Sequence, residues 1–596
     1  MSKKEKESVR RINRRTFLKG VAATGAIGAV TSAYPSSAAQ SAGENKDASK
    51  SWRDKPDPID ESLISDGGTY DVVVVGGSHA GLFCARVAAM KGAAVALIEN
   101  QAEKGYVPGI GRGHIGTVNS QYALDRGAPR IDESDFLREW ARRNVIRHNP
   151  KRASYFVKNS GKVLDWILSF ADKESLAKKT HLQSCPPKPA VLMDVSGWKF
   201  YYGTAQLGME VWPAVCKTHY QKAVADGAKW FFGHHAEICD VDGSGAVTGV
   251  IAKKADGKYV RFKARKGVAL CTGDFSANRE MVIDILDEVR HQAEARGDLN
   301  LINIVNEGMQ SPRDGSGIKM GVWAGGHVEI GPHSTMNELG TPGDPGTGAW
   351  FLQLDHNGER FCDEAAGTTI PQPIGSFYVT LYDANWPKVL EMMPPCHGGP
   401  DNADAANWQA RLTHLDNIKP GPISKVQQAS ATMGPMMGGL QGVSGTTCCG
   451  RTIEELIDYL DCWKGETRKK ALAEIARYNK MCENGVDDDF GKDSRIMKAT
   501  GLKNPLFYGT LTVYNGQGRN GSKGISPGLI ATTGLDTDAD GHVLNSEFKP
   551  IKGLYAAGNN AGGRFIVVYH SPMSGISVGM AITEGYMLGE RLAAGE

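Results

Sequence analysis

The residues with the clearest chemical potential are a glycine-rich run from Gly76 to Gly81 and the acidic residue Glu99. The run reads Gly-Gly-Ser-His-Ala-Gly, so backbone N–H groups can approach a phosphate without large side chains in the way. A carboxylate about 20 residues later suits the hydroxyl groups of a ribose. Ser78 stands where the dinucleotide-binding motif has its second glycine, and it is small enough for the same approach. The dinucleotide contacts expected here are Gly76, Ser78, His79, Ala80, Gly81, Glu99 and Asn100.

The elements around this run are those that would position it. Asp71–Val75 is an apolar run typical of a buried strand, Leu82–Lys91 has helical periodicity, and Ala94–Ile98 predicts a second strand. Strand, glycine turn, helix and strand form a β-α-β unit that presents a helix N-terminus to a pyrophosphate.

Two later segments distinguish a flavin from a nicotinamide. A meander of strands is predicted over Ala236–Val241, Val247–Lys253, Tyr259–Ala264 and Gly267–Leu270, and it ends at Thr272-Gly273-Asp274. Near the C-terminus, Gly553–Asn559 predicts a buried strand that runs into a glycine turn, and Ser577–Leu592 predicts a helix. Such turns offer N–H donors to a flavin ring or its ribityl chain. No second ribose-binding fingerprint is visible, so we expect FAD, with further contacts at Ala236, Glu237, Thr272, Gly273, Asp274, Asn278, Gly558, Asn559, Gly575, Ile576 and Ser577.

Composition excludes several other classes. The chain has 596 residues, 22% charged and 41% hydrophobic, with a net charge of +2, which is typical of a large globular protein and argues against a nucleic-acid-binding function. Eleven cysteines spread over the chain do not indicate a disulfide framework, and no spacing typical of a metal site is present.

The N-terminal residues resemble an export signal. Lysines and arginines crowd the first 15 residues, Arg14-Arg15-Thr16-Phe17-Leu18-Lys19 resembles the twin-arginine signal, and a mild apolar run covers Val21–Val30. The run is about half the ~20 residues that cross a bilayer, so no stable membrane span is expected. The resemblance implies export to the periplasm or the cell surface; the alternative is a basic tail without structure.

Further motifs extend the resemblance to a known family. They are Arg313–Met320, Ala324–Gly326, Asn357–Glu364, Thr452–Leu456, Ala476–Asn479, Asn484–Gly491 and Pro505–Tyr508. With the segments above, the chain resembles the fumarate reductase / succinate dehydrogenase flavoprotein superfamily over residues 68–594, in the branch with urocanate reductases and 3-ketosteroid dehydrogenases. The resemblance implies an α/β fold, in which a split Rossmann-type FAD-binding domain carries an inserted α+β capping domain and the active site lies between them.

This resemblance sets the expected organisation of the chain. The cap includes one or two amphipathic helices over residues 452–482. The resemblance also places Gly113, His114, Ile115 and Gly116 along the flavin, with FAD bound non-covalently and covalent attachment through His114 as the alternative. The expected boundaries are a signal peptide at 1–39, a linker at 40–67, the first part of the FAD-binding domain at 68–331, the cap at 332–495 and the second part of the FAD-binding domain at 496–596.

The family's substrate-binding positions predict the substrate class. His333, in Gly-Pro-His-Ser-Thr, matches the family's substrate-binding histidine. The arginine that the family has a few residues after the position of Glu364 is absent, because Ala-Ala-Gly-Thr-Thr-Ile-Pro stands there, and the histidine just before the segment at Thr532 is absent as well. The position of the family's carboxylate-clamping arginine is occupied here by Tyr569 or His570. Since three of the family's four dicarboxylate anchors are absent, we do not expect fumarate or succinate as substrates, because a buried carboxylate without its arginines is costly to desolvate.

The residues that remain favour a carbonyl-bearing substrate. The segment Tyr569–Pro572 resembles the segment of ketosteroid dehydrogenases in which a tyrosine hydroxyl and a backbone N–H polarise a ketone. This resemblance implies Tyr569 as electrophile or proton relay, because a phenol donates a hydrogen bond without carrying charge. His333 and His570 are expected to orient the substrate, and Arg564 to supply positive charge. The alternatives are that Tyr569 only packs over the flavin, that His333 is structural, and that Arg564 forms an exterior salt bridge.

The sequence therefore predicts an exported FAD-dependent reductase that transfers hydride from flavin N5 to an activated C=C bond of an aromatic or polycyclic enone or enoate, in anaerobic respiration. Its partners would be the small-molecule substrate and a separate electron-donor protein, which is a membrane cytochrome, a quinol-linked module or an FMN-carrying protein. The alternatives are a ketosteroid-type dehydrogenase that runs the reverse reaction and a flavin-binding electron carrier without catalysis.

Overall fold

The structure is a computed structural model, and it describes residues 51–106, 108, 114–183, 185–295, 297–302, 313–333, 350–365, 377–394, 418–422, 447–513, 530–567 and 569–595. Backbone contacts divide the chain into two units, Met1–Pro56 and Asp57–Glu596. All structural features described below belong to the second unit. The signal peptide expected at residues 1–39 lies outside the described residues, as does Gly113.

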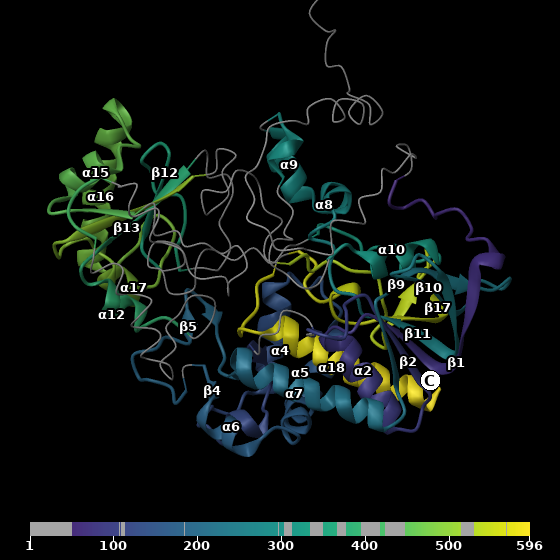
Figure 1. Cartoon of the computed structure of the whole chain (residues 1–596). Coiled ribbons are helices and arrows are strands. Elements are labelled where there is room, and N and C mark those ends of the chain that lie inside the picture. Colours follow the sequence, from purple (N-terminus) through teal and green to yellow (C-terminus); the bar gives the residue numbers. More distant parts are fainter. Residues whose placement is uncertain are drawn as a thin grey trace, which may run out of the picture. The chain divides into compact units, whose positions relative to one another are not determined.

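The larger sheet is built on an apolar central strand (Figure 1). Val72 to Val75 are at most 1% exposed, because neighbours cover both faces of the strand β1 (Ile64–Val75). β1 pairs in parallel with β2 and β11, β2 with β8, and β11 with β17, which gives the order β16-β17-β11-β1-β2-β8. The other strands of this sheet are β2 (Val95–Glu99), β8 (Lys229–Phe232), β9 (His234–Val241), β10 (Val247–Lys254), β11 (Tyr259–Leu270), β16 (His542–Leu544) and β17 (Pro550–Ala556).

These strands confirm the predicted β-α-β unit and the buried strand predicted near the C-terminus, which is β17. One local prediction is wrong: Tyr259–Ala264 and Gly267–Leu270 form the single strand β11 rather than two strands. Arg265 and Lys266 interrupt the apolar pattern, but Arg265 stays in extended backbone and its Nε lies 3.0 Å from Asp71 Oδ1 on β1.

Two long helices pack on this sheet with their backbones close together. They are α2 (His79–Met90) and α18 (Ile576–Ala594). A Cβ on Gly585 would lie 2.2 Å from the carbonyl oxygen of Ala80, and one on Gly589 would lie 2.6 Å from that of Cys84. Only glycine therefore permits this approach, which brings the C-terminal helix against the helix of the phosphate turn. Two further helices, α5 (Pro150–Leu168) and α7 (Gly208–Ala225), complete this layer.

A second, antiparallel sheet is formed by residues that lie between β11 and β16 in the sequence. Its order is β12 (Leu352–Asp355), β13 (Phe377–Asp383), β15 (Phe507–Val513) and β14 (Thr447–Gly450). The helices expected at 452–482 are present as α15 (Ile453–Leu460) and α16 (Gly465–Asn484). Because β15 pairs with β13 and β14, this sheet extends past residue 495.

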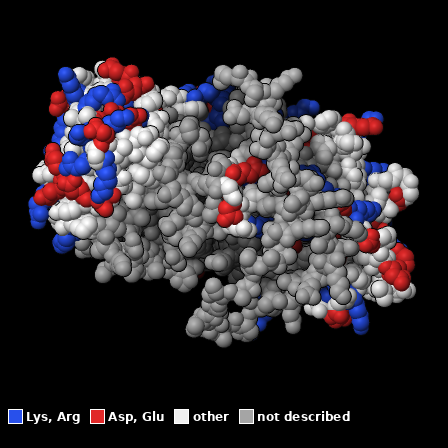
Figure 2. All heavy atoms as spheres, turned by 90° about the horizontal axis from the view of Figure 1, so that it is seen from above, with Lys and Arg blue, Asp and Glu red and all other residues white. Residues whose placement is uncertain are grey.

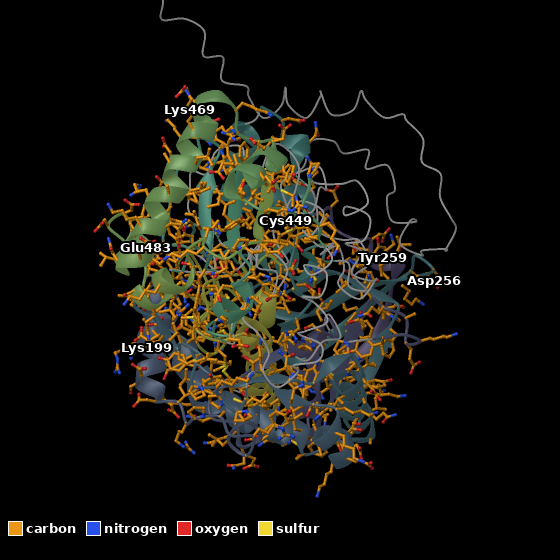
Figure 3. The ribbon with its side chains drawn as sticks, turned by 90° about the vertical axis from the view of Figure 1, so that its left-hand side faces the viewer. Lys199, Asp256, Tyr259, Cys449, Lys469 and Glu483 are labelled. Atoms are coloured by element: carbon orange, nitrogen blue, oxygen red, sulfur yellow. The ribbon has the colours of Figure 1, made fainter. Side chains whose placement is uncertain are left out.

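The outer surface of these helices is polar. Lys469 and Glu483 on α16 are labelled in Figure 3, together with Cys449 of β14, which is fully buried. Basic and acidic side chains are mixed over this part of the surface (Figure 2), for example in the pairs Lys469–Glu466 and Arg468–Asp458.

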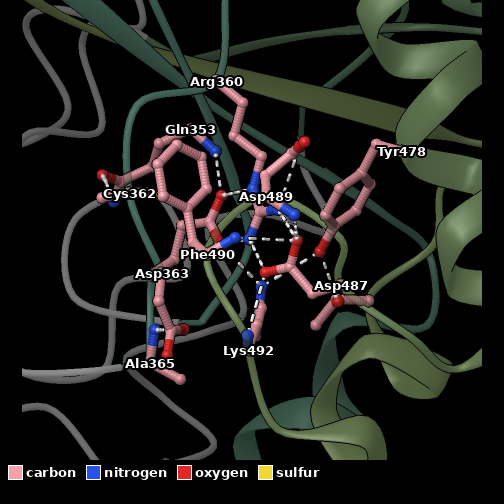
Figure 4. Close-up of polar contacts among 12 residues, drawn as sticks. Gln353, Arg360, Cys362, Asp363, Ala365, Tyr478, Asp487, Asp489, Phe490 and Lys492 are labelled. Atoms are coloured by element: carbon pink, nitrogen blue, oxygen red, sulfur yellow. Dashed lines mark hydrogen bonds and ion pairs between the residues drawn. The ribbon is translucent and has the colours of Figure 1, made fainter.

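A buried ionic network joins the loop after β12 to the segment after α16 (Figure 4). Arg360 binds Glu364 through Nε at 3.0 Å and Asp487 through Nη1 at 2.6 Å. Lys492 Nζ lies 3.0 Å from Glu364 Oε2 and donates to the hydroxyl of Tyr478 at 3.0 Å. All four charged side chains have 0% exposure, so each depends on its partners for compensation of its buried charge.

Helices that could cross a membrane were sought among the described residues, and none has the necessary length and apolar character.

Candidate active site

The predicted phosphate turn lies between β1 and α2. Gly76 has a φ of +91°, a conformation that favours glycine. A Cβ on Gly81 would lie 1.9 Å from the carbonyl oxygen of Gly76, so this position also requires glycine. Ser78 stands at the position of the motif's second glycine and is the N-cap of α2. Its Oγ accepts the N–H of Gly81 at 3.4 Å.

Glu99 closes this turn from the end of β2. Its Oε2 accepts the N–H of Gly77 at 2.6 Å, and its Oε1 accepts the N–H of Gln101 at 2.8 Å. Sequence reasoning missed Tyr106, whose hydroxyl donates to the carbonyl of Gly77 at 2.5 Å and whose pKa burial raises well above 10. Asn100, expected to contact the dinucleotide, is exposed next to Glu99.

His79 cannot supply positive charge to a phosphate. Its ring is buried, and its Nε2 accepts the indole N–H of Trp212 on α7 at 3.0 Å. Burial lowers the pKa of His79 to about 4, so the ring is neutral. The side chain therefore belongs to the packing of α2 against α7, while Ala80 and the rest of the first helical turn present backbone N–H groups.

The turn after β11 is joined to the C-terminal turn through Asn560. The N–H of Thr272 donates to Asn560 Oδ1, and Asn560 Nδ2 donates to the carbonyl of Gly273 at 3.1 Å. Thr272 Oγ1 also accepts the N–H of Gly317, at the start of α10 (Ser316–Trp323), at 3.0 Å. Asp274 is buried and accepts the N–H and hydroxyl of Ser276, so its carboxylate orders its own loop.

A charged cluster links β9 to the start of α10. His235 Nδ1 lies 3.2 Å from Glu237 Oε1, and its Nε2 lies 3.3 Å from Asp314 Oδ2. These two carboxylates raise the pKa of His235 to about 9. Asn278 joins the same region, because its Nδ2 donates to the carbonyl of Asp314 at 3.0 Å. Ala236 is buried in β9 between two of these residues.

The expected loop along the flavin meets the start of α18. Ile115 and Gly116 lie on the strand β3 (His114–Gly116), and the N–H of Gly116 donates to the carbonyl of Gly575 at 2.9 Å. Gly575 has a φ of +73° and precedes Ile576 and Ser577, the first residues of α18. His114 is exposed at the start of β3.

Arg564 is the most unusual charged group of the C-terminal segment. It has 0% exposure, so the expectation of an exterior salt bridge as its alternative role is wrong. Its Nη2 donates to Asn559 Oδ1 and its Nε donates to the carbonyl of Ala561 at 3.3 Å, whereas Nη1 has no hydrogen-bond partner among the described residues. Burial lowers the pKa of Arg564, and the nearby carboxylates Glu584 and Glu329 oppose this shift.

The other expected catalytic side chains, Tyr569, His570 and His333, each contact a different partner. Tyr569 is 5% exposed, its ring lies 4.6 Å from that of Phe565, and it acts electrostatically on Arg564. His570 is buried against Trp198, with ring centroids 4.7 Å apart. His333 Nε2 donates to the carbonyl of Glu329 at 2.7 Å. A neutral His333 ring is thereby fixed with Nδ1 as an acceptor.

These residues fit an FAD. The glycine turn with the N-terminus of α2 suits the pyrophosphate, and Glu99 suits the ribose. The turns at 272–274 and 558–560 are bound to one another. Nη1 of Arg564, which has no hydrogen-bond partner in the part of the chain that the structure describes, offers a buried donor to a bound molecule. When bound, FAD supplies hydride chemistry at this place.

The chain is similar to flavin-dependent enzymes along nearly all of its length. Vinyl phenol reductase of Lactiplantibacillus plantarum is 23% identical over 535 residues, which cover 88% of this chain and 96% of the relative. Digoxin reductase of Eggerthella lenta is 23% identical over 644 residues, covering 98% and 97%. The 3-ketosteroid-Δ4-(5α)-dehydrogenase of Rhodococcus jostii, solved with 4-androstene-3,17-dione, shares the fold with a TM-score of 0.61 at 17% identity, over 89% of this chain and 98% of that one.

The family model of the FAD binding domain matches residues 71–578. This range begins at the strand of the phosphate turn and ends in the first turn of the helix packed against it. The protein therefore belongs to the FAD binding domain family and is an FAD-dependent oxidoreductase.

Proposed function

We propose that this protein is a reductase of a C=C bond activated by a neighbouring carbonyl or aromatic group, in an aromatic or polycyclic small molecule rather than a small dicarboxylate. The observation that carries the proposal is the fully buried Arg564, whose Nη1 has no partner among the described residues. A buried guanidinium is costly unless its charge is compensated. An electron-rich oxygen of a bound molecule, which accepts a hydrogen bond from Nη1, would stabilise it. The two reductases that resemble this chain are named for vinyl phenol and digoxin, which supports a substrate of this class.

Three side chains of the protein, Tyr569, Arg564 and His333, would bind and polarise the substrate. Tyr569 holds a proton at a phenol in an apolar cluster, where a hydrogen bond to a substrate oxygen gains strength from the exclusion of water. Arg564 favours negative charge that develops on the same oxygen. His333, with its Nε2 bound to Glu329, offers Nδ1 to a substrate donor when neutral, and it donates from Nδ1 only when protonated.

The test is anaerobic. The purified holoprotein is reduced with dithionite or reduced viologen, and reoxidation is followed by flavin absorbance with enones, aryl enoates, a vinyl phenol and fumarate. We expect fast reoxidation by an enone or aryl substrate and none by fumarate. Equally fast reoxidation by fumarate would show that the argument from the absent arginines is wrong.

The same panel separates the alternatives. Bleaching of the oxidised flavin by saturated ketones, without reoxidation by enones, would indicate a dehydrogenase. No response to any compound would favour an electron carrier.

We further infer that the protein is exported and receives its electrons from a separate donor protein in anaerobic respiration. The twin arginines Arg14 and Arg15 support export, and no nicotinamide-binding fingerprint was found in the sequence. Cell fractionation of the native host, with Arg14→Lys/Arg15→Lys as the comparison, tests this. The native chain should leave the cytoplasm and the variant should remain there.

A further inference from the structure

Glu329 joins two distant segments of the candidate site through its side chain. Glu329 is 4% exposed. Oε1 accepts the N–H of Gly534 at 3.2 Å, and Oε2 accepts the N–H of Gly563 at 2.5 Å. Gly563 directly precedes Arg564, so one oxygen of Glu329 fixes the backbone that carries the buried guanidinium.

The backbone of Glu329 makes two further contacts. Its N–H donates to the carbonyl of Gly534 at 3.0 Å, and its carbonyl accepts Nε2–H of His333 at 2.7 Å. A single residue therefore links His333, the segment at Gly534 and the turn of Arg564. A Cβ on Gly562 would lie 2.7 Å from the carboxyl carbon, so the turn is packed directly on this side chain.

The carboxylate is held by backbone N–H groups, without an ion pair within 4.0 Å among the described residues. Burial raises the pKa of Glu329 to about 7. The N–H groups of Gly563 and Gly534 and the charge of Arg564 oppose this shift, whereas the carboxylate of Asp536 adds to it. Asp536 in turn faces His327, whose Nε2 lies 3.8 Å away.

Protonation would weaken this arrangement. An ionised carboxylate accepts both N–H groups in charge-assisted hydrogen bonds, whereas a protonated one has lost its charge and carries a hydroxyl oxygen, which is a poorer acceptor. The N–H of Gly563 or that of Gly534 would then have a poorer acceptor, which is unfavourable for a buried group. The sign of the pH dependence follows from the same contacts: each N–H lowers the pKa of Glu329, so release of one N–H from the buried carboxyl raises this pKa further, and proton binding favours the released turn. The turn at 562–564 would move to relieve this.

We propose that Glu329 is a positioning residue for the reduction reaction, whose ionised carboxylate holds the turn of Arg564 in the arrangement that acts on the substrate and whose protonation releases that turn. The inference rests on the proposed function for its effect on turnover. Its structural part, the release of the turn, does not depend on any substrate.

The first measurement therefore needs no substrate. Hydrogen exchange of the holoprotein is followed by mass spectrometry at pH 6, 7 and 8, with correction for the intrinsic pH dependence of exchange. In the wild type, the peptide that covers residues 558–567 should be protected at pH 8 and lose protection by pH 6. In Glu329→Gln, which cannot ionise, the peptide should be poorly protected at all three values.

The second measurement uses an acceptor identified by the reoxidation panel. In the wild type, kcat should rise by about tenfold from pH 6 to pH 8, as the ionised fraction of a group with a pKa near 7 does. In Glu329→Gln, kcat should be low and independent of pH over this range. A larger effect on kcat than on KM is expected, because the residue acts through Arg564 rather than by touching the substrate.

Asp383 offers a matched control. It is equally buried at 4% exposure at the end of β13, and its carboxylate accepts the backbone N–H groups of Asn385, Lys503 and Asn504, which lie in the turns beside the second sheet. Asp383→Asn should lower stability while it leaves the exchange of 558–567 and the pH profile as in the wild type.

The outcomes separate this inference from the proposed function. If no compound of the panel reoxidises the flavin but the exchange of 558–567 changes as described, the proposed function fails and the positioning role stands. If Glu329→Gln keeps the wild-type protection and its pH dependence, the inference is overturned, whatever the substrate.

Discussion

Tyr569 is the side chain whose chemistry can be tested with the smallest change. Tyr569→Phe removes one hydroxyl and leaves the ring in its contact with Phe565, within the apolar cluster that also contains Met573. We expect kcat for substrate reduction to fall by about a hundredfold or more, the usual contribution of a positioned proton donor. Steady-state kinetics and the flavin spectrum of the variant check this. FAD content should remain that of the wild type, and unchanged turnover would mean that Tyr569 only packs.

His235 predicts a pH-dependent stability. Its pKa is raised from 6.5 to about 9 by Asp314 and Glu237, so the folded state holds the proton more tightly than the unfolded state. The stabilisation is complete below pH 6.5 and is lost as the pH rises through about 9. His235→Gln should therefore differ most from the wild type in free energy of unfolding at pH 6 and least at pH 9.5, measured by urea unfolding. A difference that does not change with pH would contradict this.

Some of these residues could be predicted because their motif lies within one short stretch of the sequence. Gly76, Gly81 and Glu99 are spaced by one β-α-β unit, and the structure brings them together. Asn560 and Glu329 were missed because their roles arise only when segments far apart in the sequence meet at Gly273 and Gly563. The role of His79 could not be predicted for the same reason, since Trp212 comes from another helix.

At the scale of elements, the contact between β1 and α2 depends on Gly81. In Gly81→Ala the new Cβ would lie 1.9 Å from the carbonyl oxygen of Gly76, so the turn has to shift. We expect the purified variant to contain little FAD, as measured by the ratio of flavin to protein absorbance. Gly243→Ala is the control, because a Cβ there meets no atom of the described residues within 4 Å, and the FAD content of this variant should not change. Full FAD content in Gly81→Ala would show that the turn does not form the phosphate site.

The loop after β12 depends on Arg360. Arg360→Met removes one of the two cationic partners of the buried Glu364, which keeps Lys492, and the guanidinium that pairs with the buried Asp487. Breaking such a buried pair costs about 3–5 kcal/mol, so a clear loss of unfolding free energy is expected in chemical denaturation. Lys469→Met, which breaks an exposed pair with Glu466, should cost about 0.2–1 kcal/mol at most. Equal losses for the two variants would contradict the role given to the network.

Elements with strong periodicity were predictable in the same way. The apolar run of β1 and the two helices α15 and α16 follow from local pattern. The continuity of β11 could not be predicted in this way, because Arg265 is typical of a strand end in the sequence. Its place inside the strand is stabilised by Asp71 on the neighbouring strand, which the sequence alone does not show.

For the whole molecule, the candidate FAD site is assembled from segments near residues 76–99, 114–116, 272–274 and 558–577. A ligand that binds only the folded chain stabilises it by about 2.7 kcal/mol at a concentration of 100 times Kd. We expect the melting temperature of deflavinated protein to rise steadily with added FAD, as measured by calorimetry. ATP, which shares only the adenosine and phosphate chemistry, is the control and should raise it less. A melting temperature independent of FAD would contradict this assembly.

The parallel pairing of Val268–Leu270 with Leu554–Ala556 has a consequence for protein synthesis. A ribosome makes the first of these strands long before the second, so part of β11 has no neighbour on that side while the whole second sheet is being translated. An unpaired strand edge is a template for association with other chains. The nascent chain should therefore depend on chaperone protection until its last helix emerges, and FAD should load only after translation ends.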